Sequence, residues 1–247
     1  MQKIRLRSRI EAAKELKTKK SGQSIRKKEQ HPNEDNKKKL IIFDFDGVII
    51  DSLPAIFQIY DLICEKLSIE KSDDIKNGDF YEVDYKETLA KLGVIDEESI
   101  KIAETLYRDN IPVLRKLAQP FPEIKKIFKK LEINHKIAIV SNNNKPEIET
   151  RLKEIGILDT VNMILDFSFH KVKPDPGQII HCMEELGVMP HETVFVGDME
   201  GDMDAAKRAN VRKIIGVTYG YHSKHKMSKA DVLVDKPSDL LSAIEAS

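Results

Sequence analysis

Short apolar runs alternate with helical patterns along the chain from Leu40 onward. Each run has the length of a strand and several are rich in β-branched residues, which is typical of buried strands. Strands that alternate with helices predict a parallel sheet whose crossover helices cover both faces. We therefore expect a Rossmann-like α/β fold with strands at residues 40–43, 137–140, 161–165, 193–196, 213–217 and 231–234.

Two of the intervening helices carry clear start and stop residues. One begins at Pro146 and ends at Gly156, and the other begins at Asp175-Pro176 and ends at Gly187. Proline is favoured in the first turn of a helix, and glycine is favoured just past its last turn. The sequence therefore predicts the bounds of both helices.

Residues 54–118 interrupt this alternation, because they show helical periodicity and no convincing strand. We interpret them as an all-helical cap inserted into an α/β core of residues 40–53 and 119–247. The apolar faces of the cap would come from Leu62, Leu67, Leu89, Leu92, Ile102, Leu106 and Leu114. The sequence leaves open which of its larger polar side chains face the cleft, the candidates being Tyr60, Tyr81, Tyr85, Arg108, Arg115 and Lys116.

Charge is distributed unevenly, although the chain as a whole is formally neutral. Residues 1–39 contain 14 Lys or Arg and 5 Asp or Glu. We expect this piece to be a flexible basic extension. The alternative is an arm that docks on RNA, an anionic membrane or an acidic protein, which makes nucleic acid its candidate partner.

Several classes of protein are disfavoured by the composition. No apolar stretch reaches the roughly 18 to 20 residues of a membrane-spanning helix, and the charged start lacks the apolar centre of a secretory signal. We therefore expect a cytoplasmic location. Cys64 and Cys182 match no disulfide, zinc or redox spacing, so both are expected to be reduced and buried. The histidines show no metal-ligand spacing, and His222 and His225 are interpreted as loop residues.

Two carboxylates follow the first predicted strand directly, in the segment Asp44-Phe45-Asp46-Gly47. Residues two apart on an extended chain point the same way, and a glycine beside them lets backbone amides approach an anion closely. The end of this strand is thus a candidate site for an anion and a metal. An ordinary strand-ending turn with solvated acids is the alternative for this segment taken alone.

Polar side chains that suit a phosphoryl group occur at two further places. Ser141 and Asn142 come directly after the strand at 137–140 and can donate hydrogen bonds, although both residue types are also ordinary turn and cap formers. Lys173 is followed by a pair of prolines that stiffen the backbone and fix where its side chain begins. Its ammonium is a candidate for neutralising a phosphoryl group, whereas Lys171 is interpreted as a surface residue.

A second pair of acids, Asp198 and Asp202, follows the strand at 193–196. Mg²⁺ takes about six oxygen ligands, usually one or two carboxylates together with water and substrate phosphate. Asp202 can alternatively cap the helix that follows it. Right-handed crossovers bring the carboxyl ends of parallel strands to one edge of the sheet, where open α/β sheets bind ligands. We therefore expect these acids to lie close to Asp44 and Asp46.

Taken together and in this order, the four segments resemble the haloacid dehalogenase superfamily of phosphotransferases. The resemblance rests on DFDGV, the serine of VSNN, the lysine of KPDP and GDMEGD, and it spans roughly residues 40–245. The surrounding segments DGVIIDS, LGVMPHETVFVGD and GVTYGYHS are similar to the branch that contains phosphoglycolate phosphatase and β-phosphoglucomutase. In that branch a helical cap is inserted after the first motif.

The resemblance implies a role for each candidate residue. Asp44 would be the nucleophile, Asp46 the general acid and base, and Lys173 the catalytic cation. The residues implied as Mg²⁺ ligands or as support for the ion are Asp44, Asp46 through its backbone carbonyl, Asp198 and Asp202. The groups implied as holders of the phosphoryl oxygens are Ser141, Lys173 and the amides of Gly47 and Asn142.

This set implies Mg²⁺-dependent hydrolysis of a small phosphomonoester, of the phosphoglycolate phosphatase kind, through an aspartyl-phosphate intermediate. Asp46 argues against a dehalogenase, because that reaction has no leaving alcohol to protonate. Two alternatives stay open. One is a phosphomutase of the β-phosphoglucomutase type, which hands the phosphoryl group to a second hydroxyl. The other is a protein that binds nucleic acid or another partner through residues 1–39.

Overall fold

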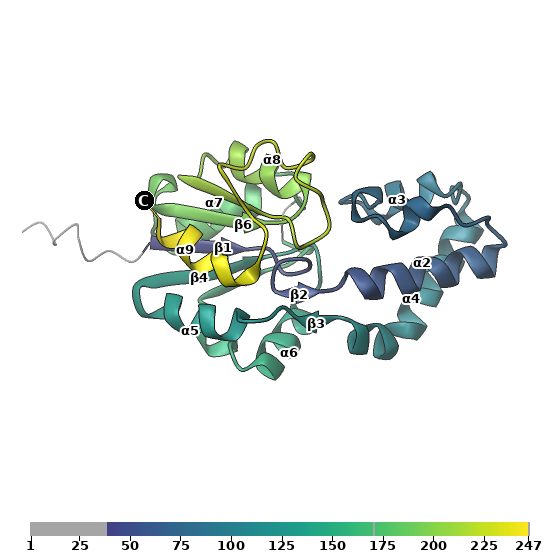
Figure 1. Cartoon of the computed structure of the whole chain (residues 1–247), viewed down its shortest axis with the longest axis horizontal. Helices are drawn as coiled ribbons and strands as arrows, with labels where there is room; N and C mark the ends of the chain where they lie inside the picture. Colours follow the sequence, from purple (N-terminus) through teal and green to yellow (C-terminus); the bar gives the residue numbers. More distant parts are fainter. Residues whose placement is uncertain (1–38, 170, 247) are drawn as a thin grey trace, which may run out of the picture. The chain divides into compact units, whose positions relative to one another are not determined.

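The computed structural model describes residues 39–169 and 171–246. The basic extension predicted over residues 1–39, with its candidate nucleic-acid arm, lies outside the described residues except for Lys39. Six parallel strands form one sheet in the order β5-β4-β1-β6-β7-β8 (Figure 1). They are β1 (Lys39–Phe43), β4 (His135–Val140), β5 (Met163–Leu165), β6 (Thr193–Gly197), β7 (Lys213–Val217) and β8 (Val232–Val234). All six predicted strands are therefore present.

Helices cover both faces of this sheet, as the alternation predicts (Figure 1). Successive residues of a strand point to opposite faces, so Ile41 and Phe43 pack into one apolar cluster and Leu40 and Ile42 into the other. The helices that pack into the first cluster are α5 (Ile124–Asn134), α6 (Lys145–Ile155) and α9 (Leu240–Glu245). The helices that pack into the second cluster are α7 (Gly177–Glu185) and α8 (Glu200–Arg208). The chain between these elements also forms the short helices η4 (Leu158–Thr160), η5 (Pro190–Glu192) and η6 (Pro237–Asp239).

The predicted helix bounds hold to within about two residues. Asn144 caps α6, its Oδ1 accepting a hydrogen bond from the amide of Glu147 at 3.0 Å, and Gly156 ends the helix with φ of +78°. That left-handed conformation is one that glycine adopts at low cost. The helix predicted from Asp175 is α7, whose first residue, Gly177, donates its amide to the Asp175 side chain at 2.9 Å.

The stretch interpreted as a cap leaves and rejoins the sheet domain through two very short strands. These strands, β2 (Ile50–Asp51) and β3 (Gln119–Pro120), pair antiparallel. Between them lies the inserted segment, residues 53–118, all of which are described and none of which is a strand. It consists of α2 (Leu53–Leu67), η2 (Asp73–Lys76), η3 (Gly78–Phe80), α3 (Tyr85–Lys91) and α4 (Glu97–Leu117). These helices bury a third apolar cluster of their own.

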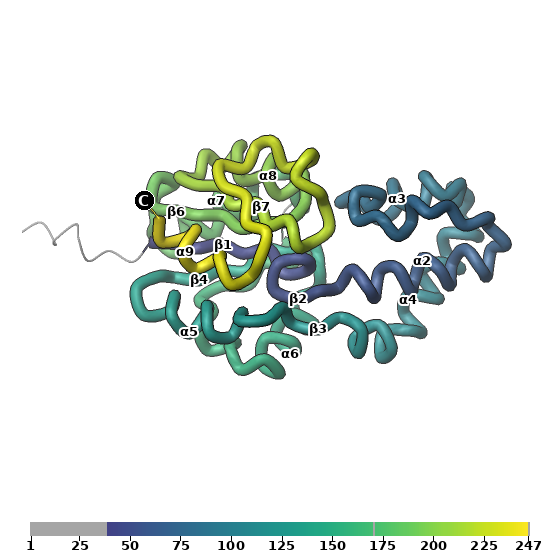
Figure 2. Tube along the Cα trace, in the orientation of Figure 1, coloured from purple at the N-terminus to yellow at the C-terminus, as the bar shows by residue number. Residues whose placement is uncertain are grey.

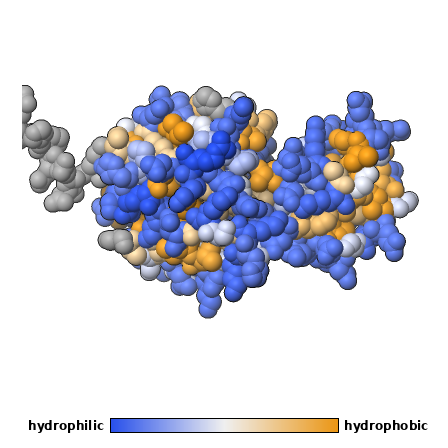
Figure 3. All heavy atoms as spheres, turned by 90° about the horizontal axis from the view of Figure 1, so that it is seen from above, coloured by the Kyte–Doolittle hydropathy of each residue, from blue (hydrophilic) through white to orange (hydrophobic). Residues whose placement is uncertain are grey.

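Figure 2 shows that α2 and α4 run side by side, as do the two short strands at their base. Seen from above, the surface is mostly hydrophilic, with apolar side chains showing between the polar ones over the inserted segment (Figure 3). Cys64 and Cys182 are buried free thiols, as expected. Among the described residues, no helix has both the length and the apolar composition that crossing a membrane requires.

Candidate functional site

The end of β1 places Asp44 at the carboxyl edge of the sheet, flanked by β4 and β6. Its amide donates to the carbonyl of Val196 at 2.9 Å, which continues the strand pairing one residue past β1. The residue is 7% exposed, and its Oδ1 accepts hydrogen bonds from the Phe45 amide at 2.7 Å and from Lys173 Nζ at 2.8 Å. The carboxylate is therefore held in one orientation.

Lys173 lies between two carboxylates that come from different strand ends. Its Nζ is 2.8 Å from Asp44 Oδ1 and 2.6 Å from Asp202 Oδ1, and only 3% of the residue is exposed. Burial alone would lower the pKa of Lys173, but the charges of Asp202 and Asp44 raise it above its ordinary value. The amine is therefore charged at neutral pH, in the place where the sequence predicts a cation.

Asp202 already has partners for both of its oxygens. While Oδ1 faces Lys173, Oδ2 accepts the amides of Asp198 at 3.1 Å and Met199 at 3.0 Å, just before α8 begins. Both readings of Asp202 that the sequence leaves open therefore apply at once, because it caps a helix and lies in the acidic cluster. Its geometry suits a residue that orients its neighbours.

Asp198 is completely buried and keeps one carboxylate oxygen without a partner. Oδ2 accepts the Tyr221 amide at 2.7 Å, whereas Oδ1 has no hydrogen-bond partner among the described residues. A buried polar atom without a partner is costly and points to a ligand. Oxygen atoms of Asp44, Asp198 and Asp202 all lie within 4.8 Å of one another. This set of hard oxygen donors fits a cation such as Mg²⁺.

The cluster carries more negative than positive charge, and this affects how its members titrate. Burial, against the opposing effect of Lys173, raises the pKa of Asp44 to about 7. Burial, followed by the charges of Asp202 and Asp44, raises the pKa of Asp198 well above its ordinary value. A divalent cation would relieve this repulsion and favour the ionised carboxylates.

Two glycines make room for the carboxylate of Asp198. Gly47 has φ of +76°, and a Cβ on it would lie 1.9 Å from Asp198 Oδ2. A Cβ on Gly220 would lie 2.5 Å from the same oxygen. Gly47 therefore leaves room for Asp198, which the sequence did not predict. Its amide donates to the carbonyl of Ile50 at 2.8 Å. Its predicted contact with phosphate stays a prediction.

The loop after β4 brings its polar residues to the same edge. Ser141 is 1% exposed, and its Oγ accepts the Asn143 amide at 3.1 Å. Asn142 Oδ1 is buried and has no hydrogen-bond partner in the part of the chain that is described. Asn143, which the sequence did not single out, donates its Nδ2 to Asp46 Oδ2 at 3.0 Å. This contact fixes the second acid of the first motif.

Burial raises the pKa of Asp46, and the hydrogen bond from Asn143 opposes that rise. The two acids of the first motif thus have different environments, since Asp44 pairs with a lysine and Asp46 with a neutral amide. Two carboxyl groups with different partners can take different proton-transfer roles.

The loop at residues 219–226 connects the site with the inserted segment, a contact that the local sequence pattern does not indicate. His222 is buried, accepting the Glu200 amide on Nδ1 at 3.0 Å and lying with Nε2 2.9 Å from the carbonyl of Tyr81. Nε2 therefore carries the proton, and burial lowers the pKa of His222. Tyr221 Oη lies 3.0 Å from Ser52 Oγ. His222 is a loop residue, as expected, and it also connects α8 to the inserted segment.

Two cavities are lined by residues of the site. A cavity of about 160 Å³ is lined by Asp46, Asn143 and, from the inserted segment, Tyr107 and Arg115. A wider cavity of about 610 Å³ is lined by Lys173 and Asn142, together with residues of α3 and the loop before it. The inserted segment therefore contributes walls to both.

Comparisons with known proteins agree with this architecture. The family described as haloacid dehalogenase-like hydrolase matches residues 41–216. Phosphoglycolate phosphatase of Aquifex aeolicus is 27% identical over 219 residues, which cover 84% of this chain and 97% of that protein. Phosphoglycolate phosphatase of Vibrio vulnificus is 28% identical over 222 residues, which cover 85% of this chain and 97% of that protein.

Solved structures are similar over the same extent. A haloacid dehalogenase-like family protein of Streptococcus pneumoniae aligns with a TM-score of 0.73 at 20% identity, covering 84% of this chain and 99% of that one. A predicted phosphoglycolate phosphatase of Haemophilus somnus aligns with a TM-score of 0.71 at 23% identity, covering 84% and 98%. At this level of identity the structures support the fold alone.

Proposed function

The chain belongs to the haloacid dehalogenase-like hydrolases and is a phosphatase, and from that premise we propose that it hydrolyses a small phosphomonoester of the phosphoglycolate type through an aspartyl-phosphate on Asp44. The observation that carries this proposal is the arrangement around Lys173. One buried ammonium contacts the predicted nucleophile at 2.8 Å and lies beside a carboxylate cluster that fits a cation. Charge stabilisation of this kind is what phosphoryl transfer mainly requires.

The proposed reaction has two steps. An oxygen of Asp44 attacks phosphorus while the bond from phosphorus to the leaving oxygen breaks, and Asp46 gives its proton to that oxygen. A water molecule then attacks phosphorus, Asp46 takes the proton of that water, and the bond to Asp44 breaks to release phosphate. The raised pKa of Asp46 suits a group that must hold a proton in the first step and accept one in the second.

Each remaining predicted residue has a proposed part. Lys173 orients Asp44 and balances phosphoryl charge, while Ser141 and the amide of Asn142 are proposed to bind phosphoryl oxygens. Gly47, whose amide already donates to the carbonyl of Ile50, leaves room for Asp198. Asp44, the Asp46 carbonyl and Asp198 would hold Mg²⁺, with Asp202 in support. When bound, Mg²⁺ would reduce the repulsion between an anionic nucleophile and an anionic phosphate.

We also propose that the chain divides into an α/β core of residues 40–53 and 119–247 and a cap of residues 54–118 that selects the substrate. The buried cluster within the inserted segment supports this division, because a domain is expected to have its own core. The two short strands β2 and β3 would be the connections between the two parts.

A substrate panel tests the proposed function. Purified enzyme with Mg²⁺ is assayed for phosphate release from 2-phosphoglycolate, several sugar phosphates and an aryl phosphate, with Asp44→Asn as the control. We expect release that exceeds the control and stops when EDTA removes the metal. Conversion of a hexose 1-phosphate into its 6-phosphate, without phosphate release, would instead identify a mutase. No turnover of any substrate above the control would refute the proposal.

A further inference from the structure

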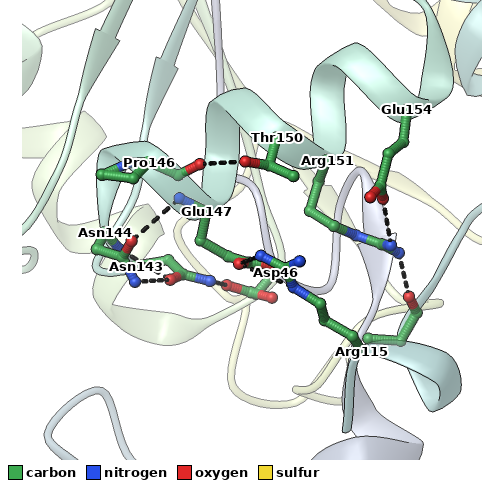
Figure 4. A network of polar contacts seen from close by, with 10 residues as sticks. Asp46, Arg115, Asn143, Asn144, Pro146, Glu147, Thr150, Arg151 and Glu154 are labelled. Carbon is green, nitrogen blue, oxygen red and sulfur yellow. Dashed lines mark hydrogen bonds and ion pairs between the residues drawn. The ribbon is translucent and has the colours of Figure 1, made fainter. Parts of the chain in front are cut away.

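An ion pair connects the inserted segment to the sheet domain beside Asp46 (Figure 4). Arg115, near the end of α4, binds the carboxylate of Glu147 in the first turn of α6. Arg115 Nε lies 2.9 Å from Oε1 and 3.0 Å from Oε2, and Nη2 also contacts Oε2. Both residues line the 160 Å³ cavity that contains Asp46.

Glu147 engages only one edge of the guanidinium. Arginine has five N–H donors arranged to bind carboxylates in pairs, and the contacts with Glu147 use Nε and Nη2. Across residues 39–169 and 171–246, no hydrogen bond engages Nη1 of Arg115. Its side chain is 39% exposed and lines the cavity, so the guanidinium is accessible to a molecule that enters there.

The other arginine of this cavity is not available in the same way. Arg151 donates Nη1 to Glu154 at 2.7 Å and Nη2 to the carbonyl of Ala118, and its side chain is only 12% exposed (Figure 4). It thus ties the end of the inserted segment to α6. Among the candidates that the sequence left open in the cap, Arg108 is on the same helix as Arg115 but is 69% exposed and contacts Asp109.

The leaving group of the proposed reaction has to lie next to Asp46, because that residue protonates it. The small cavity beside Asp46 is therefore the leaving-group site, and Arg115 is its available cation. The wider cavity contains Lys173 and Asn142, which are proposed to hold the phosphoryl group, and the rest of its lining includes five carboxylates that disfavour a second anion there, namely Glu82, Asp84, Glu87, Glu200 and Asp204. Like charges raise the cost of placing an anion there.

We infer that Arg115 determines specificity by binding a carboxylate on the leaving alcohol, through the guanidinium edge that Glu147 leaves open. This inference rests on the proposed function and narrows its substrate class to phosphomonoesters of small hydroxy acids. Glu147 holds Arg115 in place for this contact and is a positioning residue. The contact between Arg115 and the carboxylate of Glu147 shows that this guanidinium can bind a carboxylate through paired hydrogen bonds.

The test compares two substrates that differ only in charge. 2-Phosphoglycolate and its neutral amide share the phosphoryl group and have leaving groups of nearly the same size. The ratio of their kcat/KM values is measured for wild type, Arg115→Met, Arg115→Lys and the matched control Arg108→Met. The wild-type kcat/KM is expected to be about tenfold or more higher for the acid than for the amide. Arg115→Met is expected to lose most of that preference, because its KM for the acid rises.

Arg115→Lys keeps the charge but not the paired donors, so its acid-to-amide ratio of kcat/KM should lie between those of wild type and Arg115→Met. Arg108→Met should keep the wild-type ratio. Equal turnover of acid and amide by the wild type would overturn the inference, and so would an unchanged ratio in Arg115→Met. Should Arg115→Met fail to fold, inhibition of the wild type by glycolate against glycolamide gives the same comparison. Inactivity on every substrate would instead count against the proposed function, so the two failures are distinguishable.

Discussion

Replacing Lys173 by methionine tests whether the site is organised around one buried cation. The substitution keeps most of the side-chain length and removes the charge that lies between Asp44 and Asp202 at 2.8 and 2.6 Å. Lys173 is only 3% exposed, so solvent cannot compensate for the loss. Breaking a buried ion pair in this way costs about 3 to 5 kcal/mol of the free energy of unfolding.

The loss is expected to grow with pH. In the folded wild type the pKa of Asp44 is already raised from 3.8 to about 7, and removing the amine raises it further. A carboxyl group whose pKa rises on folding binds more protons in the folded state. The free energy of unfolding therefore decreases as pH rises from the ordinary pKa through the folded one. The difference between variant and wild type should thus be larger at pH 8 than at pH 5.

Urea unfolding followed by circular dichroism, without added metal, measures this at pH 5, 6.5 and 8. The matched control is Lys171→Met, because Lys171 is exposed and lies two residues away. The control is expected to change stability by less than about 0.5 kcal/mol. A loss in Lys173→Met below about 1 kcal/mol, or an equal loss at pH 5 and pH 8, would refute the reasoning.

Three further outcomes are expected. Mg²⁺ should raise Tm more at pH 8 than at pH 6, because it competes with protons for the buried carboxylates, and thermal scans of Asp198→Asn should show no such shift. Gly47→Ala should lower the free energy of unfolding by more than about 2 kcal/mol, through its positive φ and the clash with Asp198. Gly93→Ala, with positive φ but open space around it, should lose only about 1 kcal/mol in the same urea titrations. Asn143→Ala removes the hydrogen bond that lowers the pKa of Asp46. The alkaline limb of the pH–rate profile should therefore move to higher pH. An unchanged alkaline limb would show that turnover does not use this contact.

The strands of the fold were predictable because each one combines an apolar run with polar residues at its end. The central strand β1 is buried on both faces, so its sequence is apolar from Leu40 to Phe43, and Asp44, itself buried, is the first polar residue after it. The acids were found for the same reason, whereas Lys173 was found from the prolines that follow it. Their common location follows from parallel strand order, which the alternation of strands and helices already implies.

Other features depend on packing that local patterns do not encode. The strands β2 and β3 have two residues each, too few for a period to be recognised. The pair of Arg115 and Glu147 joins residues 32 positions apart, and it depends on how α4 meets α6. The role of His222 likewise depends on a carbonyl that is 141 positions away. Asn143 lies in a segment that the sequence analysis recognised, but its contact with Asp46, 97 positions away, was not predicted.

Trapping the phosphorylated enzyme tests the central claim most directly. The Asp46→Asn variant can still be phosphorylated by an activated aryl phosphate but lacks the base that activates water for the second step. After an acid quench in the presence of Mg²⁺, peptide mass spectrometry should find one phosphoryl group, on the side chain of Asp44. Absence of that group, or its presence on any other residue, would contradict the account.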